Sequence, residues 1–275
     1  MTVIAMTREV GSLGTDVASG VAKELRLKII HSESVATHVA ERMGVEAGAV
    51  RRYADGSASA MERWLFSRRK FTHYTSEEVL RLAQQGNVLI RGWGAAALLR
   101  DLPQVVSVRV CAPMAFRVRT MMRKTGINDS DTVRRDIERF DAAHARFMRA
   151  SFNAEREELL YHLVLNTDRL PVEACVKAIC ALARHSRFRD HLTTQSVLAD
   201  KLLEAKVNSA LGDEISPTMA PAGIRVSADK GRVTLIAASP SGNLRAKAEK
   251  VVASIAGVRA IDNRIISVPS HGRRL

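Results

Sequence analysis

The sequence predicts an α/β protein that consists of a doubly wound parallel sheet followed by a small αββαβ domain. Two observations indicate the large sheet: short apolar, β-branched runs alternate with segments of helical periodicity, and these runs are apolar on both faces. The third observation indicates the small domain. Beyond about residue 190, the alternation gives way to a helix, a hairpin, a second helix and a closing strand.

Five stretches of the first part have the composition of buried strands. In chain order they are Thr2–Met6, Leu27–Ile30, Val88–Ile90, Val105–Ala112 and Leu163–Leu165. Val105–Ala112 is almost continuously apolar, as expected for a strand that helices cover on both faces. Strands of this kind, alternating with helices, imply parallel βαβ units.

Helical periodicity fills the segments between these strands. The predicted helices are Asp16–Leu25, an irregular region at 33–74, Ser76–Gly86, a helix starting at Pro113, Ser130–Phe152 and Pro171–Ala183. Ser76 is expected to cap its helix because Glu77 and Glu78 would lie in the first turn, and Gly86 is expected to end it.

A charged connector at 184–190 precedes the smaller domain. The elements predicted beyond it are Ser196–Leu211, Ile224–Ala228, Val233–Ala238, Leu244–Ala256 and Ile261–Val268. Asp229-Lys-Gly231 is a hairpin signal between the two strands. We therefore expect a domain at 1–187, a linker at 188–195, a domain with its own core at 196–268, and a frayed tail at 269–275.

Composition and charge narrow the classes of function. No run approaches the ~20 apolar residues of a membrane span, and no basic segment with a long apolar run opens the chain, so a cytoplasmic location is expected. A net charge of +13 attracts polyanions, but the arginines are scattered and aromatic residues make up only 4%. A small anionic ligand is therefore favoured over nucleic acid.

The sequence predicts no metal site. Cys111, Cys175 and Cys180 form neither a disulfide framework nor a CxxC motif, and the last two lie in an apolar-periodic stretch, as buried small hydrophobes do. The eight histidines show no HxH or HExxH spacing.

Residues 3–22 follow the pattern of a phosphate site, in which a strand leads through a glycine-containing turn into a helix. Gly11 and Gly14 allow backbone N–H groups to point inward, and the helix start adds partial positive charge. Many turns of this kind hold no ligand, so the turn alone leaves both interpretations open.

Five stretches, in order, resemble the cytidylate-kinase-like family. They are Thr7-Arg-Glu-Val-Gly11-Ser-Leu-Gly14, Val88-Leu-Ile-Arg-Gly-Trp-Gly-Ala95, Val108–Pro113 with Arg117, Asp141–Phe147, and Leu163–Thr167. The resemblance covers most of residues 1–185 and implies the P-loop-type fold of nucleoside monophosphate kinases. It also implies that an active protein would use ATP and Mg²⁺ to transfer a phosphoryl group to a nucleoside monophosphate.

The resemblance implies a set of site residues as well. Catalytic roles would fall to Asp141, Arg146 and Arg149. Phosphate or nucleotide binding would fall to Arg8, Gly11, Ser12, Gly14, Thr15, Asp16, Arg91, Trp93, Arg117, Arg123, Arg135 and Arg139. Helical spacing places Arg135, Arg139 and Arg146 on one face, where they would bind phosphate or, alternatively, pair with acidic neighbours in solvent.

The turn departs from the full phosphate-binding motif. Gly14 stands where the motif has its lysine, and Asp16 stands where it has Ser or Thr, although Arg8 could supply the missing charge. Trp93, at a position where the family has arginine, could stack on a base or pack at the sheet edge. Two functions stay open: phosphoryl transfer, and a non-catalytic nucleotide or anion sensor or adaptor.

Residues 196–268 resemble a BON domain, a small αββαβ module. The matching stretches are Val207–Leu211, Ile224–Val226, Gly231–Leu235, and Ala253–Val258 followed by Ile261–Val268. The resemblance implies a docking or regulatory role through contact with phospholipid or a protein partner. Lys247 and Lys250 could touch an anionic surface or form a solvated helix face.

Overall fold

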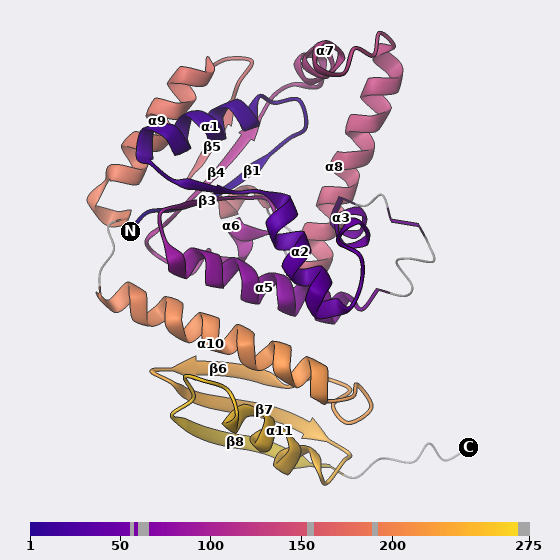
Figure 1. The fold of residues 1–275 in the computed structure, drawn as a ribbon, viewed down its shortest axis with the longest axis vertical. Coiled ribbons are helices and arrows are strands. Elements are labelled where there is room, and N and C mark those ends of the chain that lie inside the picture. The colour runs from indigo at the N-terminus through magenta and orange to yellow at the C-terminus, as the bar shows by residue number, and fades with distance from the viewer. Residues whose placement is uncertain (56–57, 60–65, 153–156, 189–191, 269–275) are drawn as a thin grey trace.

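The computed structural model describes residues 1–55, 58–59, 66–152, 157–188 and 192–268. A larger α/β part and a smaller one are stacked along the long axis of the molecule, with helix α10 (Leu192–Glu214) between them (Figure 1). The predicted tail at 269–275 and residues 189–191 of the predicted linker lie outside the described residues.

The larger sheet is parallel, with the strand order β2-β3-β1-β4-β5. Its strands are β1 (Val3–Arg8), β2 (Lys28–Ile30), β3 (Val88–Arg91), β4 (Val105–Cys111) and β5 (Leu163–Asn166). The central strand β1 pairs on both sides, Val3 lying opposite Val88 of β3 and Val105 of β4. Because helices lie on both faces, the predicted doubly wound parallel sheet is confirmed (Figure 1).

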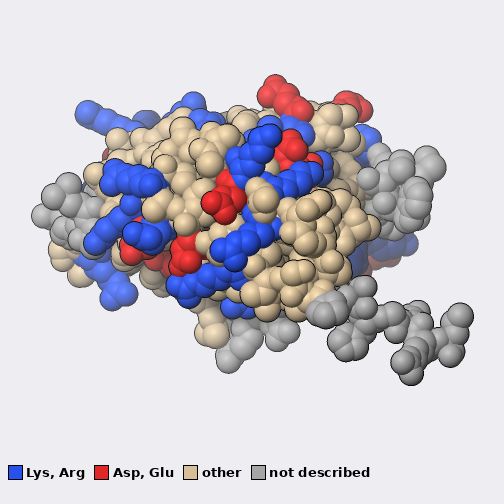
Figure 2. Space-filling model, turned by 90° about the horizontal axis from the view of Figure 1, so that it is seen from below, with Lys and Arg blue, Asp and Glu red and all other residues tan. Residues whose placement is uncertain are grey.

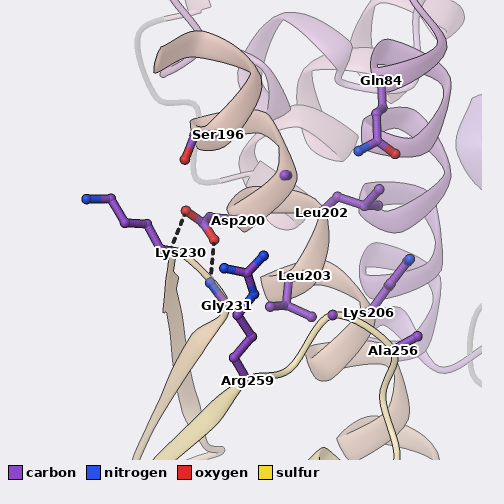
Figure 3. A pocket seen from close by; sticks show the side chains of 12 residues that line it. Gln84, Ser196, Asp200, Leu202, Leu203, Lys206, Lys230, Gly231, Ala256 and Arg259 are labelled. Carbon is purple, nitrogen blue, oxygen red and sulfur yellow. Dashed lines mark hydrogen bonds between the residues drawn. The ribbon is translucent and has the colours of Figure 1, made fainter. Parts of the chain in front are cut away.

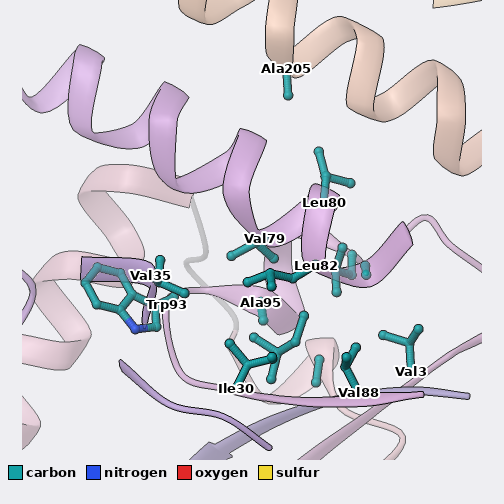
Figure 4. Close-up of a cluster of buried hydrophobic side chains, with 14 of the residues drawn as sticks. Val3, Ile30, Val35, Val79, Leu80, Leu82, Val88, Trp93, Ala95 and Ala205 are labelled. Carbon is teal, nitrogen blue, oxygen red and sulfur yellow. The ribbon is translucent and has the colours of Figure 1, made fainter. Parts of the chain in front are cut away.

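The helices of this part include a layer on each face of the sheet. They are α1 (Gly14–Leu25), α2 (Ser32–Met43), α3 (Ala47–Asp55), α5 (Arg68–Gln85), α6 (Ala95–Leu98), α7 (Met114–Thr125), α8 (Ser130–Phe152) and α9 (Val172–Arg184), with 3-10 turns at Glu157–Leu160 and Ser186–Phe188. Between the sheet and α1 and α9, Ile4 packs with Val17 and Cys175. On the other face, Val3 and Val88 pack with Leu82 of α5 (Figure 4). Helix α7 packs against α8 in a separate cluster.

Helix α5 begins at a different serine from the predicted one. Ser67 is the cap, and its Oγ accepts a hydrogen bond from the Lys70 N–H at 3.4 Å. Ser76 lies inside the helix, where its hydroxyl donates to the Thr72 carbonyl at 2.7 Å. The predicted Ser76 cap is wrong because Phe71 and Tyr74 are buried and continue the apolar face toward the N-terminus.

The smaller part is a three-stranded sheet with two helices. Its elements are α10, β6 (Arg225–Asp229), β7 (Arg232–Ser239), α11 (Leu244–Ala253) and β8 (Ala260–Ser267). β6 and β7 are antiparallel, and β7 and β8 are parallel. Lys230 and Gly231 both have positive φ, 49° and 82°, as the predicted hairpin turn requires.

Helix α10 is longer than predicted and has apolar side chains on two sides. Leu198, Leu202 and Ala205 are buried in the core that contains α5, and Figure 4 shows Ala205 facing Leu80. Leu203 and other side chains on the opposite side are buried in the core of the small sheet. One helix therefore belongs to both cores and joins the two parts.

Polar contacts reinforce the packing of α5 against α10. Asp213 of α10 accepts a hydrogen bond from the Tyr74 hydroxyl and lies 3.5 Å from both Lys70 Nζ and Arg42 Nη2. Burial, together with this hydrogen bond, raises the pKa of Tyr74 to about 12.

Among the described residues, no helix has the length and apolar composition needed to cross a bilayer.

His73 of α5, whose Nδ1 atom lies beside Gly212 of α10, makes the packing of these two helices sensitive to pH. Its Nδ1 atom is buried without a hydrogen-bond partner among the described residues. Burial and then the charge of Arg69 lower the pKa of His73 from 6.5 to about 4. Between these values the unfolded chain binds a proton that the folded chain excludes, so the contribution of His73 to stability is fully present above pH 6.5 and is lost as the pH drops toward 4.

We expect the urea midpoint to fall between about pH 7 and about pH 5, and His73→Gln to remove part of that fall. The exposed His185 provides the matched control, His185→Gln, which should keep the wild-type pH dependence. If His73→Gln and the wild type lose the same stability over this range, the assignment of the effect to His73 is wrong.

Candidate functional site

A cavity of about 570 Å³ opens at the carboxyl ends of strands β1 and β3. The residues that line it are Thr7, Arg8, Glu9, Val10, Arg51, Ala54, Arg91, Gly92, Trp93, Arg109, Phe140, Asp141, His144, Ala145 and Phe147. They come from the ends of β1 and β3, from β4, and from helices α3 and α8. Ligands of parallel α/β sheets bind at this edge, so the cavity is the candidate site.

The two acidic residues of the cavity are already neutralised. Glu9 Oε1 lies 3.0 Å from Arg109 Nη2, and Glu9 Oε2 accepts the Ala112 N–H at 3.2 Å. Asp141 forms a bidentate pair with Arg117, with N···O distances of 2.8 and 2.7 Å. Neither carboxylate is left to repel an anion.

Three arginines of the cavity, Arg8, Arg51 and Arg91, form no ion pair with a carboxylate among the described residues. Arg91 Nη2 lies 3.4 Å from His31 Nδ1, which carries no negative charge. Burial and the neighbouring charge of Arg91 lower the pKa of Arg8. Guanidinium groups crowded together without counter-charges provide a binding site for an anion such as phosphate.

The Arg117 side chain is only 4% exposed and is occupied by protein groups. Its Nε donates to the Val10 carbonyl at 2.7 Å, both terminal nitrogens bind Asp141, and Glu9 lies 3.6 Å away. Arg117 and Asp141, two of the predicted site residues, therefore form an ion pair with each other. The pair connects the turn, α7 and α8, and Arg117 is not among the residues that line the cavity.

The turn after β1 is held by its neighbours. Gly11 has a φ of +81°, and a Cβ atom there would lie 2.6 Å from the Arg117 carbonyl oxygen, so any side chain would displace α7. The buried Ser12 hydroxyl donates to the carbonyls of Glu9, at 2.8 Å, or Val110, at 3.1 Å. The Ser12 carbonyl accepts a hydrogen bond from Thr167 at 2.8 Å. Ser12 thus holds the turn through its side chain.

Helix α1 begins at Gly14 and has no side-chain cap, since the preceding residue is Leu13. Uncapped N–H groups at a helix start are suitable donors to phosphate. A Cβ at Gly14 would lie 2.6 Å from Arg8 Cβ, so the Arg8 side chain crosses the start of the helix. Thr15 and Asp16 lie in the first turn, where Asp16 is exposed.

Aromatic side chains form another wall of the cavity. Trp93 is 7% exposed, and its ring centroid lies 6.1 Å from that of Phe71 in the core. Phe147 lies edge-on to Phe71 at 5.8 Å. Trp93 therefore packs into the core, as one of the two alternatives predicted, and it also lines the cavity, whereas stacking on a base stays a prediction. Apolar rings beside unpaired cations suit a ligand that has both a ring and a charged group.

Other predicted residues lie away from the cavity. Arg135, Arg139, Arg146 and Arg149 are on an exposed side of α8, and Arg123 is exposed in the last turn of α7. Arg139 pairs with Asp136 at 3.1 Å. The side of α8 that faces the cavity carries Phe140, Asp141 and His144.

Several cavity residues were missing from the sequence prediction. Arg51 belongs to α3, within the region predicted only as irregular helix, and nothing in its local sequence connects it to β1. Glu9 and Arg109 could have been included, since they lie in the first and third of the matching stretches. Phe140 directly precedes the fourth stretch.

Comparisons with known proteins find matches for both parts of the chain. The model of the family described as Cytidylate kinase-like family matches residues 3–169, and that of the BON domain matches residues 199–269. A cytidylate kinase of Ignicoccus hospitalis is 27% identical over 184 residues, covering 65% of this chain and 97% of the relative. One of Pyrobaculum islandicum is 24% identical over 178 residues, covering 64% and 90%.

Two solved structures each cover 66% of the chain. An uncharacterized protein from Eubacterium ventriosum has a TM-score of 0.48 at 16% identity and covers 66% of this chain and 98% of its own. A shikimate kinase from Acinetobacter baumannii has a TM-score of 0.38 at 13% identity, with 66% and 92% covered.

The Arg117–Asp141 pair yields a prediction about stability. Asp141→Asn would leave the Arg117 guanidinium buried without its carboxylate. Breaking a fully buried pair costs roughly 3–5 kcal/mol, and because the Asp141 side chain is 40% exposed we expect about 2 kcal/mol by urea unfolding.

Asp136→Asn is the matched control, because its pair with Arg139 lies in solvent, with side chains 46% and 63% exposed. It should change the unfolding free energy by less than about 0.5 kcal/mol. Similar losses in the two variants would show that the Arg117 pair does not hold α7 and α8 to the turn.

Proposed function

The chain belongs to the cytidylate kinase-like family, and we propose that it binds a nucleoside monophosphate in the cavity beside β1 and transfers a phosphoryl group to it from ATP. One observation carries the proposal. Three arginines without carboxylate partners line the cavity next to an uncapped helix start and an aromatic wall. Positioning and charge neutralisation are the main contributions that a protein makes to phosphoryl transfer.

In this proposal the acceptor occupies the cavity. Its phosphate is bound by Arg51 of α3 and Arg91 of β3, and its base lies against Trp93 and Phe140. The bidentate fork of arginine suits a phosphate oxygen pair, and the rings provide apolar contact for a base. The Arg109–Glu9 pair keeps the neighbouring carboxylate from repelling the ligand.

The donor phosphates are assigned to the turn at Gly11–Gly14 and to the start of α1. The N–H groups there, with Thr15, would bind the phosphate oxygens, and Arg8 would supply the charge that the absent lysine provides elsewhere. Mg²⁺ fits this region because it needs only one or two protein carboxylates when it arrives with phosphates and water, and Asp16 is an exposed carboxylate in the first turn. When bound, Mg²⁺ would neutralise charge on the phosphates.

The arginines that face solvent are assigned to the donor as well. Arg146 and Arg149 on α8, with Arg123, Arg135 and Arg139, would contact the transferring phosphates only after α7 and α8 move toward the turn. Kinases of this type exclude water by closing such a segment. This proposal therefore requires a movement whose extent the Arg117–Asp141 pair would limit.

A non-catalytic sensor or adaptor is the second candidate, favoured by Gly14 at the position of the lysine. The BON domain would then dock the chain on phospholipid or a protein partner. Figure 2, which views the molecule from the end that carries this domain, shows lysines and arginines interspersed with acidic residues instead of one continuous basic patch. A cytoplasmic location stays a prediction.

The decisive experiment is a turnover assay. The full chain is mixed with ATP, Mg²⁺ and each nucleoside monophosphate in turn, and diphosphate products are separated and quantified. The transferase proposal expects a diphosphate product of at least one acceptor. Saturable nucleotide binding without any product would support the sensor, and absence of both would contradict the two functions together.

We also expect Arg91→Gln to weaken binding of the acceptor by about tenfold or more, because it removes a charged partner of the phosphate. Lys177→Gln, which removes an exposed charge from α9, is the control and should bind as the wild type does. Calorimetric titration with the acceptor measures both. Unchanged affinity in Arg91→Gln would exclude the cavity as the acceptor site.

A further inference from the structure

A second cavity, of about 510 Å³, lies where the two parts of the chain meet. Helix α5 contributes Gln84, helix α10 contributes Asp200 and Lys206, and the small sheet contributes Lys230 and Arg259 (Figure 3). None of its lining residues belongs to the first cavity. Its walls therefore come from both parts of the chain.

The charges of this cavity are unbalanced. Arg259 points up beside Asp200, Lys206 extends from α10 toward α5 with Leu203 between Arg259 and Lys206 in this view, and the Lys230 side chain extends outward from the rim (Figure 3). These three cations form no ion pair among the described residues. Cations that approach one space from two sides attract an anion of matching size.

The carboxylate of Asp200 is engaged elsewhere. One oxygen accepts the Lys230 N–H at 2.9 Å and the other accepts the Gly231 N–H at 3.1 Å, as the dashed lines in Figure 3 show. Asp200 thus anchors the hairpin turn to α10. Both oxygens accept backbone N–H groups, and Asp200 forms no ion pair with Arg259 or Lys206 among the described residues. Its single negative charge does not balance the three cations of the cavity.

We propose that this cavity binds a small soluble phosphate ester, held through its phosphate by Arg259 and Lys206. A phosphate dianion matches cations arriving from opposite walls, and Leu202 and Leu203 offer apolar surface for a small organic group. Among its described lining residues there is no aromatic ring, so nothing stacks on a base as Trp93 would in the first cavity.

The place of the cavity favours a free ligand over a lipid headgroup. Helix α5 forms one wall and the hairpin another, so the site is a recess between the two parts. A phosphate fixed in a bilayer would have to bring the membrane surface against α5. A ligand in this recess would touch both parts and would stabilise the arrangement in which α10 packs on α5.

The test uses the full chain carrying Arg8→Gln and Arg91→Gln, so that phosphate binding in the first cavity is weakened. Calorimetric titration with glycerol 3-phosphate should show saturable binding, and the ligand should raise the thermal midpoint. Adding Lys206→Gln with Arg259→Gln should weaken that binding by about tenfold or more. Adding Lys247→Gln with Lys250→Gln is the control, because it removes the same charge from exposed positions of α11.

A second measurement is independent of affinity. Glycerol 3-phosphate should protect Lys206 from chemical acetylation more than it protects Lys247. Equal loss of binding in the two double variants, or equal protection of the two lysines, would overturn the proposal, because general positive charge would then explain the result. Binding of phosphatidic acid vesicles without any binding of the soluble ester would also overturn it.

This test is separate from the test of the proposed function. Turnover in the first cavity depends on Arg91, whereas binding here is measured in a chain that already lacks it. A failure of turnover in the first cavity would therefore not decide whether the ester binds in the second, and a failure of ester binding would not decide whether turnover occurs.

Discussion

The buried Arg117 guanidinium is the interaction on which the candidate site depends. It binds the Val10 carbonyl and the Asp141 carboxylate, and lies close to Glu9. These contacts fix the turn after β1 to α7 and to α8, and α8 borders the cavity. They also neutralise acidic groups beside the cavity. The positive charge of the site exists because its carboxylates are already bound by Arg117 and Arg109.

A second constraint is the double role of α10. Its two apolar sides pack into two cores. The BON domain is therefore held against the larger part by helix packing as well as by the chain connection. The packing includes the hydrogen bond from Tyr74 to Asp213, which ties the C-terminal end of α10 to α5. Since α5 leads directly into β3, which ends at Arg91, the small sheet is connected through packed helices to the edge where the candidate site lies.

The sequence predicted the sheet well because buried parallel strands are apolar on both faces, and such runs are unambiguous in β1 and β4. It failed at Ser76, where a local cap signal competed with burial of Phe71 and Tyr74, a tertiary effect. For the candidate site, the matching stretches contain Arg8, Arg91 and Trp93, which line the cavity in the folded chain. Arg51 could not be identified, because only the folded chain brings α3 to the end of β1.

The difference between lysine and arginine at this turn has a physical consequence. A lysine after the turn would be a point charge that contacts the donor phosphates from the helix side. Arg8 starts instead from β1, crosses the start of α1 at Gly14 and reaches the cavity assigned to the acceptor. Its planar fork carries several donors, so one side chain can bridge oxygens of two phosphate groups. The small residue at position 14 is then a requirement of the arrangement, since a lysine there would occupy the space through which Arg8 passes.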